Sequence, residues 1–128
     1  MAFLNWLQKI LGVGPDGEDP RKRTRVDFAT LHQRGVDFLE KDRFEEAQNA
    51  FTSAIMSRAQ EPETWFLRAI ALEGMERFDQ ALFDCNRALT LRPQTHNYLW
   101  VRARILLALG RYEESLSDAD QALKLQPG

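Results

Sequence analysis

The sequence predicts an all-α protein, an α-solenoid of three antiparallel helix hairpins that follow an N-terminal amphipathic helix. One observation is an internal repeat, because residues 43–47 (RFEEA) return as residues 77–81 (RFDQA) and 111–115 (RYEES), 34 residues apart each time. Another is that apolar residues recur with helical spacing between short turn signals, and no segment has the pattern of a strand. A repeat of this length is typical of stacked helical hairpins, in which each unit buries its apolar face against its neighbours.

The composition fits a single domain with a hydrophobic core. The 128 residues are 44% hydrophobic and 28% charged, and the net charge is −2. This charge is unevenly spread, since residues 1–25 carry +2 and the remainder carries −4. The repeat region is therefore a poor candidate for nucleic-acid binding, which needs concentrated basic side chains. With one cysteine, no apolar run of membrane-spanning length and no cationic lead of a secretory signal, we expect a cytoplasmic protein.

Residues 1–11 predict an amphipathic helix. At about 100° per residue, six apolar side chains fall within one arc, and Asn5, Gln8 and Lys9 share the other side. The six apolar residues are Phe3, Leu4, Trp6, Leu7, Ile10 and Leu11. Glycine and proline end this helix, and residues 12–25, rich in glycine, proline and charge, predict a flexible charged linker.

Six further helices are predicted after the linker. They lie near residues 26–40, 44–57, 62–74, 78–90, 95–109 and 112–125. Pro62 suits the first turn of its helix, where a missing N–H costs little, and Pro93 ends the pair before it. Residues 26–128 should thus form one domain, with repeats at about 28–61, 62–95 and 96–128.

The repeated positions resemble the tetratricopeptide repeat (TPR) family. The first helices carry a large residue and, four positions later, a small one, as in Leu31/Gly35, Trp65/Ala69 and Leu99/Ala103. The second helices read Ala47/Phe51/Ala54, Ala81/Cys85/Ala88 and Ser115/Ala119/Ala122. The resemblance covers about residues 28–128 and implies a right-handed superhelix. In it, the small residues let two helix axes approach closely.

Three aromatic residues at one repeated position, Phe44, Phe78 and Tyr112, are expected to fill the joint between the helices of each hairpin. Cys85 is interpreted as a buried, unreactive thiol, in preference to a nucleophile.

A repeated departure from the family pattern places arginine where leucine is usual, at Arg34, Arg68 and Arg102. In the second helices, Asp84 and Asp118 are placed to meet Arg68 and Arg102 respectively, whereas Ala50 stands opposite Arg34. We interpret these residues as structural ion pairs within hairpins. Such pairs are weak evidence for net stability, although removing one partner is costly.

No constellation of residues predicts catalysis, a metal site or a cofactor. His32 and His96 lie in different repeats without a neighbour at metal-ligand spacing. The acidic pairs at residues 45–46 and 113–114 begin helices, where they favour the helix dipole. The basic residues at 21–25 could contact phosphates or anionic lipid, but a solvated linker is the favoured interpretation.

The TPR resemblance implies that the first helices line a concave groove in which peptides lie. The groove residues implied by the resemblance are His32, Val36, Leu39, Phe66, Leu67, Ile70, Trp100, Val101, Arg104 and Leu107. Phe66, Ile70 and Trp100 would form its apolar centre, suited to an amphipathic helix or apolar segment. The alternative is that some of these side chains pack between repeats and leave a smaller patch.

One TPR subfamily grips the C-terminal carboxylate of heat-shock chaperones with a clamp of lysine, asparagine and arginine. The matching positions here hold His32, Val36, Leu67, Asn97 and Val101. Only Asn97 is a clamp residue type, so we do not expect that function.

The resulting hypothesis is a non-catalytic protein-interaction module, such as an adaptor, scaffold or assembly factor. Residues 3–11 would dock on the repeats, on a second molecule or in an assembly. The alternative is a peripheral membrane protein anchored by the N-terminal helix, and an enzyme is the third possibility.

The C-terminal end of the array has no further predicted helix to cover Leu116, Leu123 and Leu125. This open end predicts a fragment of a longer array, self-association, or capping by the N-terminal helix. The sequence does not identify the partner.

Overall fold

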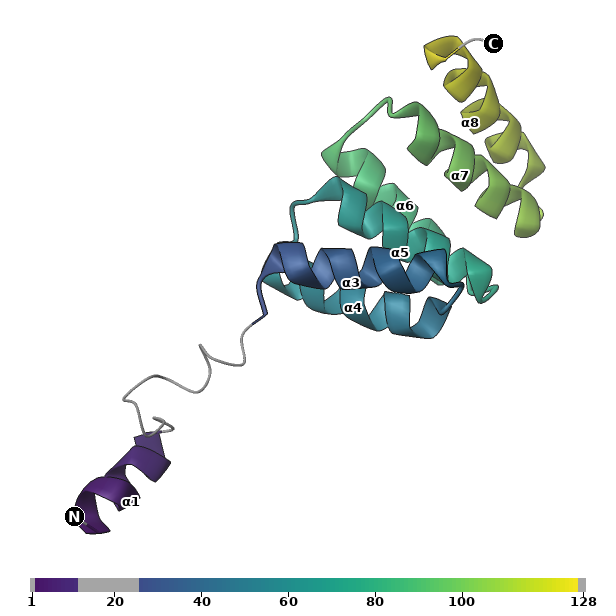
Figure 1. Cartoon of the computed structure of the whole chain (residues 1–128). Helices are drawn as coiled ribbons and strands as arrows, with labels where there is room; N and C mark the ends of the chain where they lie inside the picture. The colour runs from purple at the N-terminus through teal and green to yellow at the C-terminus, as the bar shows by residue number, and fades with distance from the viewer. Residues whose placement is uncertain (1, 12–25, 127–128) are drawn as a thin grey trace.

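The computed structural model of the chain describes residues 2–11 and 26–126 (Figure 1). Helix α1 (Ala2–Leu11) precedes the repeats. The repeat helices are α3 (Phe28–Glu40), α4 (Phe44–Ser57), α5 (Pro62–Gly74), α6 (Phe78–Leu91), α7 (His96–Ala108) and α8 (Tyr112–Leu125). These bounds confirm the predicted helices to within two residues. The predicted linker, residues 12–25, lies outside the described residues.

Helices α3 to α8 form three antiparallel hairpins that stack one on another (Figure 1). Each second helix packs against its own first helix and against the first helix of the next hairpin. First helices of adjacent hairpins also contact each other, whereas α4, α6 and α8 make no contact with one another. The array therefore curves toward α3, α5 and α7, which line its concave side. The predicted all-α solenoid is confirmed.

The turn inside each hairpin uses one left-handed residue at the same repeat position. Asp42, Glu76 and Gly110 have φ values of 57°, 59° and 77°. Just after each of them, the backbone N–H of Arg43, Arg77 or Arg111 donates to a carbonyl five residues earlier, at 2.9 Å. Only at Gly110 does the sequence place the residue that adopts this conformation without strain.

Small residues set the close approach of the two helices in each hairpin, as predicted. A Cβ added to Gly35 would collide with the ring of Phe51, so the first hairpin closes by pairing the smallest residue with a large one. The second hairpin pairs Ala69 with Cys85, and both are fully buried. The third pairs Ala103 with Ala119, the combination with the least side-chain volume.

No helix in the described residues is long and apolar enough to cross a membrane.

Candidate binding site

A pocket of about 250 Å³ opens between α7 and α8 in the last hairpin. It is lined by Trp100, Ala103, Arg104, Leu107, Ser115 and Ala119. We call this pocket the open slot. Its existence follows from the sequence of the hairpin, because the Ala103/Ala119 pair leaves space that Phe51 fills in the first hairpin. The hydroxyl of Ser115 is hydrogen-bonded within the protein, because it donates to the carbonyl oxygen of Ala103 at 2.6 Å.

The open slot lies where the next first helix would pack if the array continued. Equivalent residues one repeat earlier are covered, because α7 packs on the second hairpin. Thus Leu82 and Leu89 are each 9% exposed, while their counterparts Leu116 and Leu123 are 63% and 53% exposed. Within the described residues, no first helix packs on the outer side of α8, and Leu116 and Leu123 are therefore exposed.

The same reason corrects one expectation about the aromatic joint residues. Phe44 and Phe78 are partly buried, and the ring of Phe44 lies against Gly74 of the next hairpin. Tyr112, however, is exposed. The prediction that it fills a joint is wrong, because the cover for this position comes from the following hairpin and not from its own.

Two of the predicted groove residues lie in the core. Phe66 is 7% exposed, because the ring of Tyr98 in the next hairpin lies on it with ring centroids 4.4 Å apart. The hydroxyl of Tyr98 then donates to the carboxylate of Glu63 at 2.9 Å. Val101 is buried too. The expectation that these two side chains face a partner is wrong, since the adjoining repeat covers them.

Five other predicted groove residues, in the first two hairpins, are partly buried: His32, Val36, Leu39, Leu67 and Ile70. His32 is fixed between repeats, since its Nδ1 is hydrogen-bonded to the hydroxyl of Thr64 at 2.9 Å and its ring packs on Phe28 and Phe51. It therefore acts as a link between the first and second hairpins. None of these three contacts is with a carboxylate.

The remaining three predicted groove residues come together at the open slot. Trp100 is 49% exposed, against 7% for its repeat equivalent Phe66, and Leu107 is also exposed. Arg104 lies at the rim and donates to both carboxylate oxygens of Glu73, at 2.7 and 2.5 Å. The groove thus has its accessible apolar surface at the C-terminal end, next to a fixed guanidinium.

The predicted ion pairs inside the hairpins are confirmed. Arg68 donates to Asp84 through Nε at 2.7 Å and Nη2 at 2.8 Å, and a third bond at 3.2 Å reaches Thr52 of the previous hairpin. Arg34, the equivalent residue in the first hairpin, lies opposite Ala50 and is exposed. Arg68 therefore links the two helices of its own hairpin and also contacts the previous hairpin.

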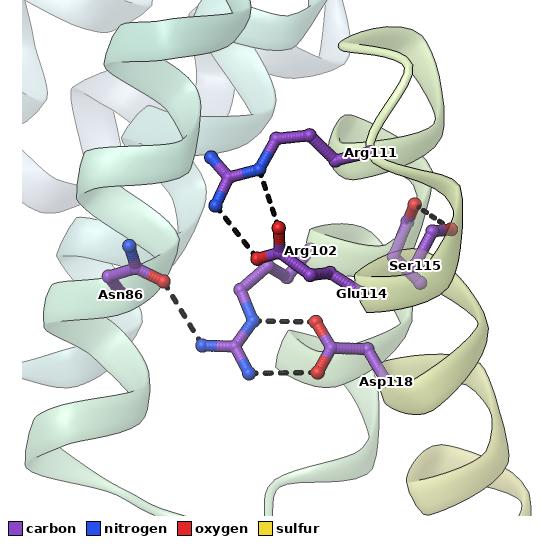
Figure 2. A network of polar contacts seen from close by, with 7 residues as sticks. Asn86, Arg102, Arg111, Glu114, Ser115 and Asp118 are labelled. Carbon is purple, nitrogen blue, oxygen red and sulfur yellow. Dashed lines mark hydrogen bonds and ion pairs between the residues drawn. The ribbon is translucent and has the colours of Figure 1, made fainter.

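The equivalent arrangement in the last two hairpins is shown in Figure 2. Arg102 donates to both oxygens of Asp118, at 2.6 and 2.8 Å, and to Asn86 at 3.0 Å, while Arg111 is bound to Glu114. These residues line a polar hollow of about 360 Å³ on the α6–α8 side. The paired charges already satisfy one another, so this hollow is a poorer binding site than the open slot.

No group of three or more potential metal ligands occurs among the described residues. Cys85 is fully buried, and burial raises the pKa of its thiol to about 12. The thiolate that reaction or metal binding requires is thus strongly disfavoured.

The N-terminal docking segment forms the helix α1. Phe3, Trp6 and Ile10 are exposed, and the rings of Phe3 and Trp6 stack with centroids 5.8 Å apart. The side chains of Leu4, Leu7 and Leu11 lie outside the described part of the structure. Over the described residues, α1 makes no contact with the repeat helices.

Sequence reasoning missed the floor of the open slot, formed by Ala103, Ser115 and Ala119. The signal was available in the decreasing size of the residue facing the small position, from Phe51 to Cys85 to Ala119. It becomes meaningful only when the three hairpins are compared with each other.

Two tetratricopeptide repeat models match the chain, one over residues 62–95 and the other over residues 96–128. They correspond to the second and third hairpins and together span just over half of the chain. Among curated proteins, no sequence matches this chain significantly.

Solved structures of TPR domains share the fold. The first TPR of Spaghetti (RPAP3) bound to the HSP90 peptide SRMEEVD is 24% identical, with a TM-score of 0.77, over 80% of this chain and 81% of that one. The TPR domain of OM64 from Arabidopsis is 25% identical, with a TM-score of 0.76, over 78% of this chain and 83% of that one. The first TPR domain of human RPAP3 is 25% identical, with a TM-score of 0.75, over 79% and 80%.

Proposed function

Because the chain belongs to the tetratricopeptide repeat family, we propose that it is a non-catalytic protein-interaction module that binds an apolar or amphipathic segment of a partner. It would act as an adaptor, scaffold or assembly factor. The observation that carries this proposal is the open slot, where Trp100 and Leu107 are exposed beside a hollow floored by small residues. Concave apolar pockets with few polar groups are the usual form of a binding site.

The chemistry of the open slot favours a helix with bulky apolar side chains on one face. The floor offers volume and apolar surface, while the one guanidinium at the rim, Arg104, is already bound to Glu73. His32, Val36, Leu39, Leu67 and Ile70 extend the same concave side toward the first hairpin and would contact a longer ligand more weakly. Phe66 and Val101 would support this surface from below.

The TPR neighbours bound to HSP90 and Hsp70 peptides support a peptide as the class of ligand. Recognition of an acidic C-terminus is nevertheless disfavoured in our proposal. Of the positions that match the family's carboxylate clamp, Asn97 alone has a clamp residue type, and Val36, Leu67 and Val101 are aliphatic. We place this activity in the cytoplasm, in keeping with the single buried cysteine.

Selection of peptides from a displayed library tests the proposal. The full chain should enrich peptides with bulky apolar residues at i, i+3 or i+4, and i+7. Trp100→Ala/Leu107→Ala should enrich none of them, because central aromatic residues commonly supply about 2 kcal/mol or more of binding free energy.

Met56→Ala is the matched control, since Met56 is an exposed apolar residue of α4 far along the array from the open slot. Helical circular dichroism of all variants should be unchanged. Equal enrichment by the wild type and the Trp100→Ala/Leu107→Ala variant would refute binding at the open slot.

A further inference from the structure

The repeats show what kind of helix fills a slot of this kind. The sites equivalent to the open slot in the first and second hairpins are each covered by the next first helix, and we call them the covered slots. Each covered slot receives three side chains, spaced i, i+3 and i+7, from that helix. On the first hairpin these are Thr64, Leu67 and Ala71, and on the second they are Tyr98, Val101 and Ile105. Five of the six are buried and Leu67 is partly buried. The occupant of the open slot should therefore present apolar side chains with this spacing.

Helix α3 of another copy does not meet this requirement. At the same three positions it carries Thr30, Gln33 and Asp37, all exposed, and the Gln33 side chain donates to Asp37 at 3.0 Å. This face of α3 is therefore polar. Stacking of whole arrays end to end would therefore bury polar groups against the apolar open slot, which is costly.

Helix α1 does meet the requirement. Phe3, Trp6 and Ile10 have the i, i+3, i+7 spacing, and all three are exposed. The surrounding sequence also parallels α7, because Phe-Leu at residues 3–4 and Lys-Ile-Leu at residues 9–11 correspond to Tyr-Leu at 98–99 and Arg-Ile-Leu at 104–106. At these five positions, the sequence of α1 therefore resembles that of α7.

We propose that α1 of a second copy of this chain occupies the open slot and caps the last hairpin as α7 caps the second. This inference deepens the proposed function by naming the ligand of the same site. Its central contact is Phe3 on Trp100, because Tyr98 lies on Phe66 at the equivalent positions, with ring centroids 4.4 Å apart. Ile10 then enters the pocket floored by Ala103 and Ala119, as Ile105 packs within the cluster that contains Cys85.

The reach of the chain favours a second copy over the same molecule. Helices α7 and α8, which form the open slot, lie at the opposite end of the array from α3 (Figure 1), so a helix in the slot would be three first-helix positions beyond α3. With helix axes about 8–10 Å apart, this separation is about 24–30 Å. A fourteen-residue coil spans about 20 Å on average. If two copies exchange their α1 helices, the same contact forms twice and a symmetric dimer closes.

The charge distribution favours the same contact. Residues 1–25 carry a net charge of +2, whereas the remainder carries −4. The exposed side of α8 includes Glu113 and Asp120, near the place that α1 would take. Added salt should therefore weaken the dimer moderately without abolishing it, since apolar burial dominates.

Sedimentation velocity of the full chain tests the proposal. The wild type should change from monomer to dimer as concentration rises. Phe3→Ala and Trp100→Ala should each weaken one contact by about thirtyfold, and dimerisation by roughly a thousandfold, because the symmetric dimer contains that contact twice. Asn5→Ala/Gln8→Ala and Met56→Ala serve as controls that retain the dimer. The Phe3→Ala/Trp100→Ala double variant should lose less dimerisation free energy than the two single variants lose together, because both substitutions remove the same contact.

A chain that is monomeric at every concentration overturns this inference, and so does a dimer that is insensitive to Phe3→Ala. Flotation of a monomeric chain with anionic vesicles, lost in Phe3→Ala, would overturn it by assigning α1 to a membrane surface. In each of these cases, peptide selection that depends on Trp100 would leave the proposed function standing. Loss of that selection alongside an intact, Trp100-dependent dimer would instead limit the open slot to α1.

Discussion

The ion pair between Arg68 and Asp84 allows a direct measurement of what a buried charge pair contributes to the stability of the second hairpin. Asp84→Ala removes the carboxylate that binds Arg68 through two bonds of 2.7 and 2.8 Å. The side chains of Arg68 and Asp84 are 17% and 2% exposed, so the cation would remain largely buried. Removing one partner of such a pair costs about 3–5 kcal/mol. We expect about 3 kcal/mol, because Thr52 and the Trp65 ring, 5.0 Å from the guanidinium carbon, still contact Arg68.

The double variant Arg68→Leu/Asp84→Leu separates the cost of an unpaired charge from the value of the pair. Leucine is the usual residue at the Arg68 position in the family, and replacing a buried ion pair with apolar residues is often neutral or stabilising. The double variant should therefore recover most of the stability that Asp84→Ala loses. Urea unfolding followed by helical circular dichroism measures both free energies. A double variant as unstable as the single one would refute this reasoning, because the loss would then reflect the bonds themselves.

Three further predictions follow from individual residues. Gly110→Ala should destabilise the protein by about 1 kcal/mol in thermal or urea unfolding, because φ is 77° there and alanine disfavours that conformation. Leu82→Ala should cost about 2–5 kcal/mol, whereas the repeat-equivalent Leu116→Ala in dilute protein should cost about 0.5 kcal/mol or less, since only Leu82 is buried. The Cys85 thiol, with its pKa raised to about 12 by burial, should react with a thiol reagent only in denaturant, and fast labelling of the native protein at neutral pH would contradict this.

The helices and hairpins could be predicted from the sequence because each repeat contains its own signals. The 34-residue period fixes which residues are equivalent, and the aspartates opposite Arg68 and Arg102 lie in the same hairpin as their partners. Pairings of this kind depend on local spacing along two adjacent helices. These ion pairs can therefore be predicted from the sequence alone.

The site was only partly predictable because the exposure of a repeat residue depends on the next repeat. Phe66 and Trp100 occupy equivalent positions, and both were expected in the groove. Tyr98 covers Phe66, whereas no described first helix follows to cover Trp100. A family pattern assigns faces to positions within one repeat. It does not contain the size of the neighbouring side chain, so it could not separate these two residues.

Side-chain volume makes the strongest test of the α1 contact. Where the slot floor is the Gly35/Phe51 pair, the residue that enters it is the small Ala71, in the same buried cluster as Phe51. Where the floor is Ala69/Cys85, the residue that enters is the larger Ile105. The volume of the floor and that of the incoming side chain are thus complementary in both covered slots. Ile10 against Ala103/Ala119 extends this relation to the open slot.

Replacing the Ala103/Ala119 floor with the Gly35/Phe51 combination of the first hairpin should therefore change the size of the residue at position 10 of α1 that fits the slot. Ala103→Gly/Ala119→Phe should abolish the dimer, because the phenyl ring would occupy the volume that Ile10 needs. Ile10→Ala in the wild-type background should weaken the dimer, since deletion of a buried isoleucine side chain costs about 2 kcal/mol or more. Combining the three substitutions should restore association in sedimentation velocity, because alanine fits beside the ring as Ala71 does beside Phe51. A triple variant that stays monomeric while retaining its helical content would show that Ile10 does not enter this pocket.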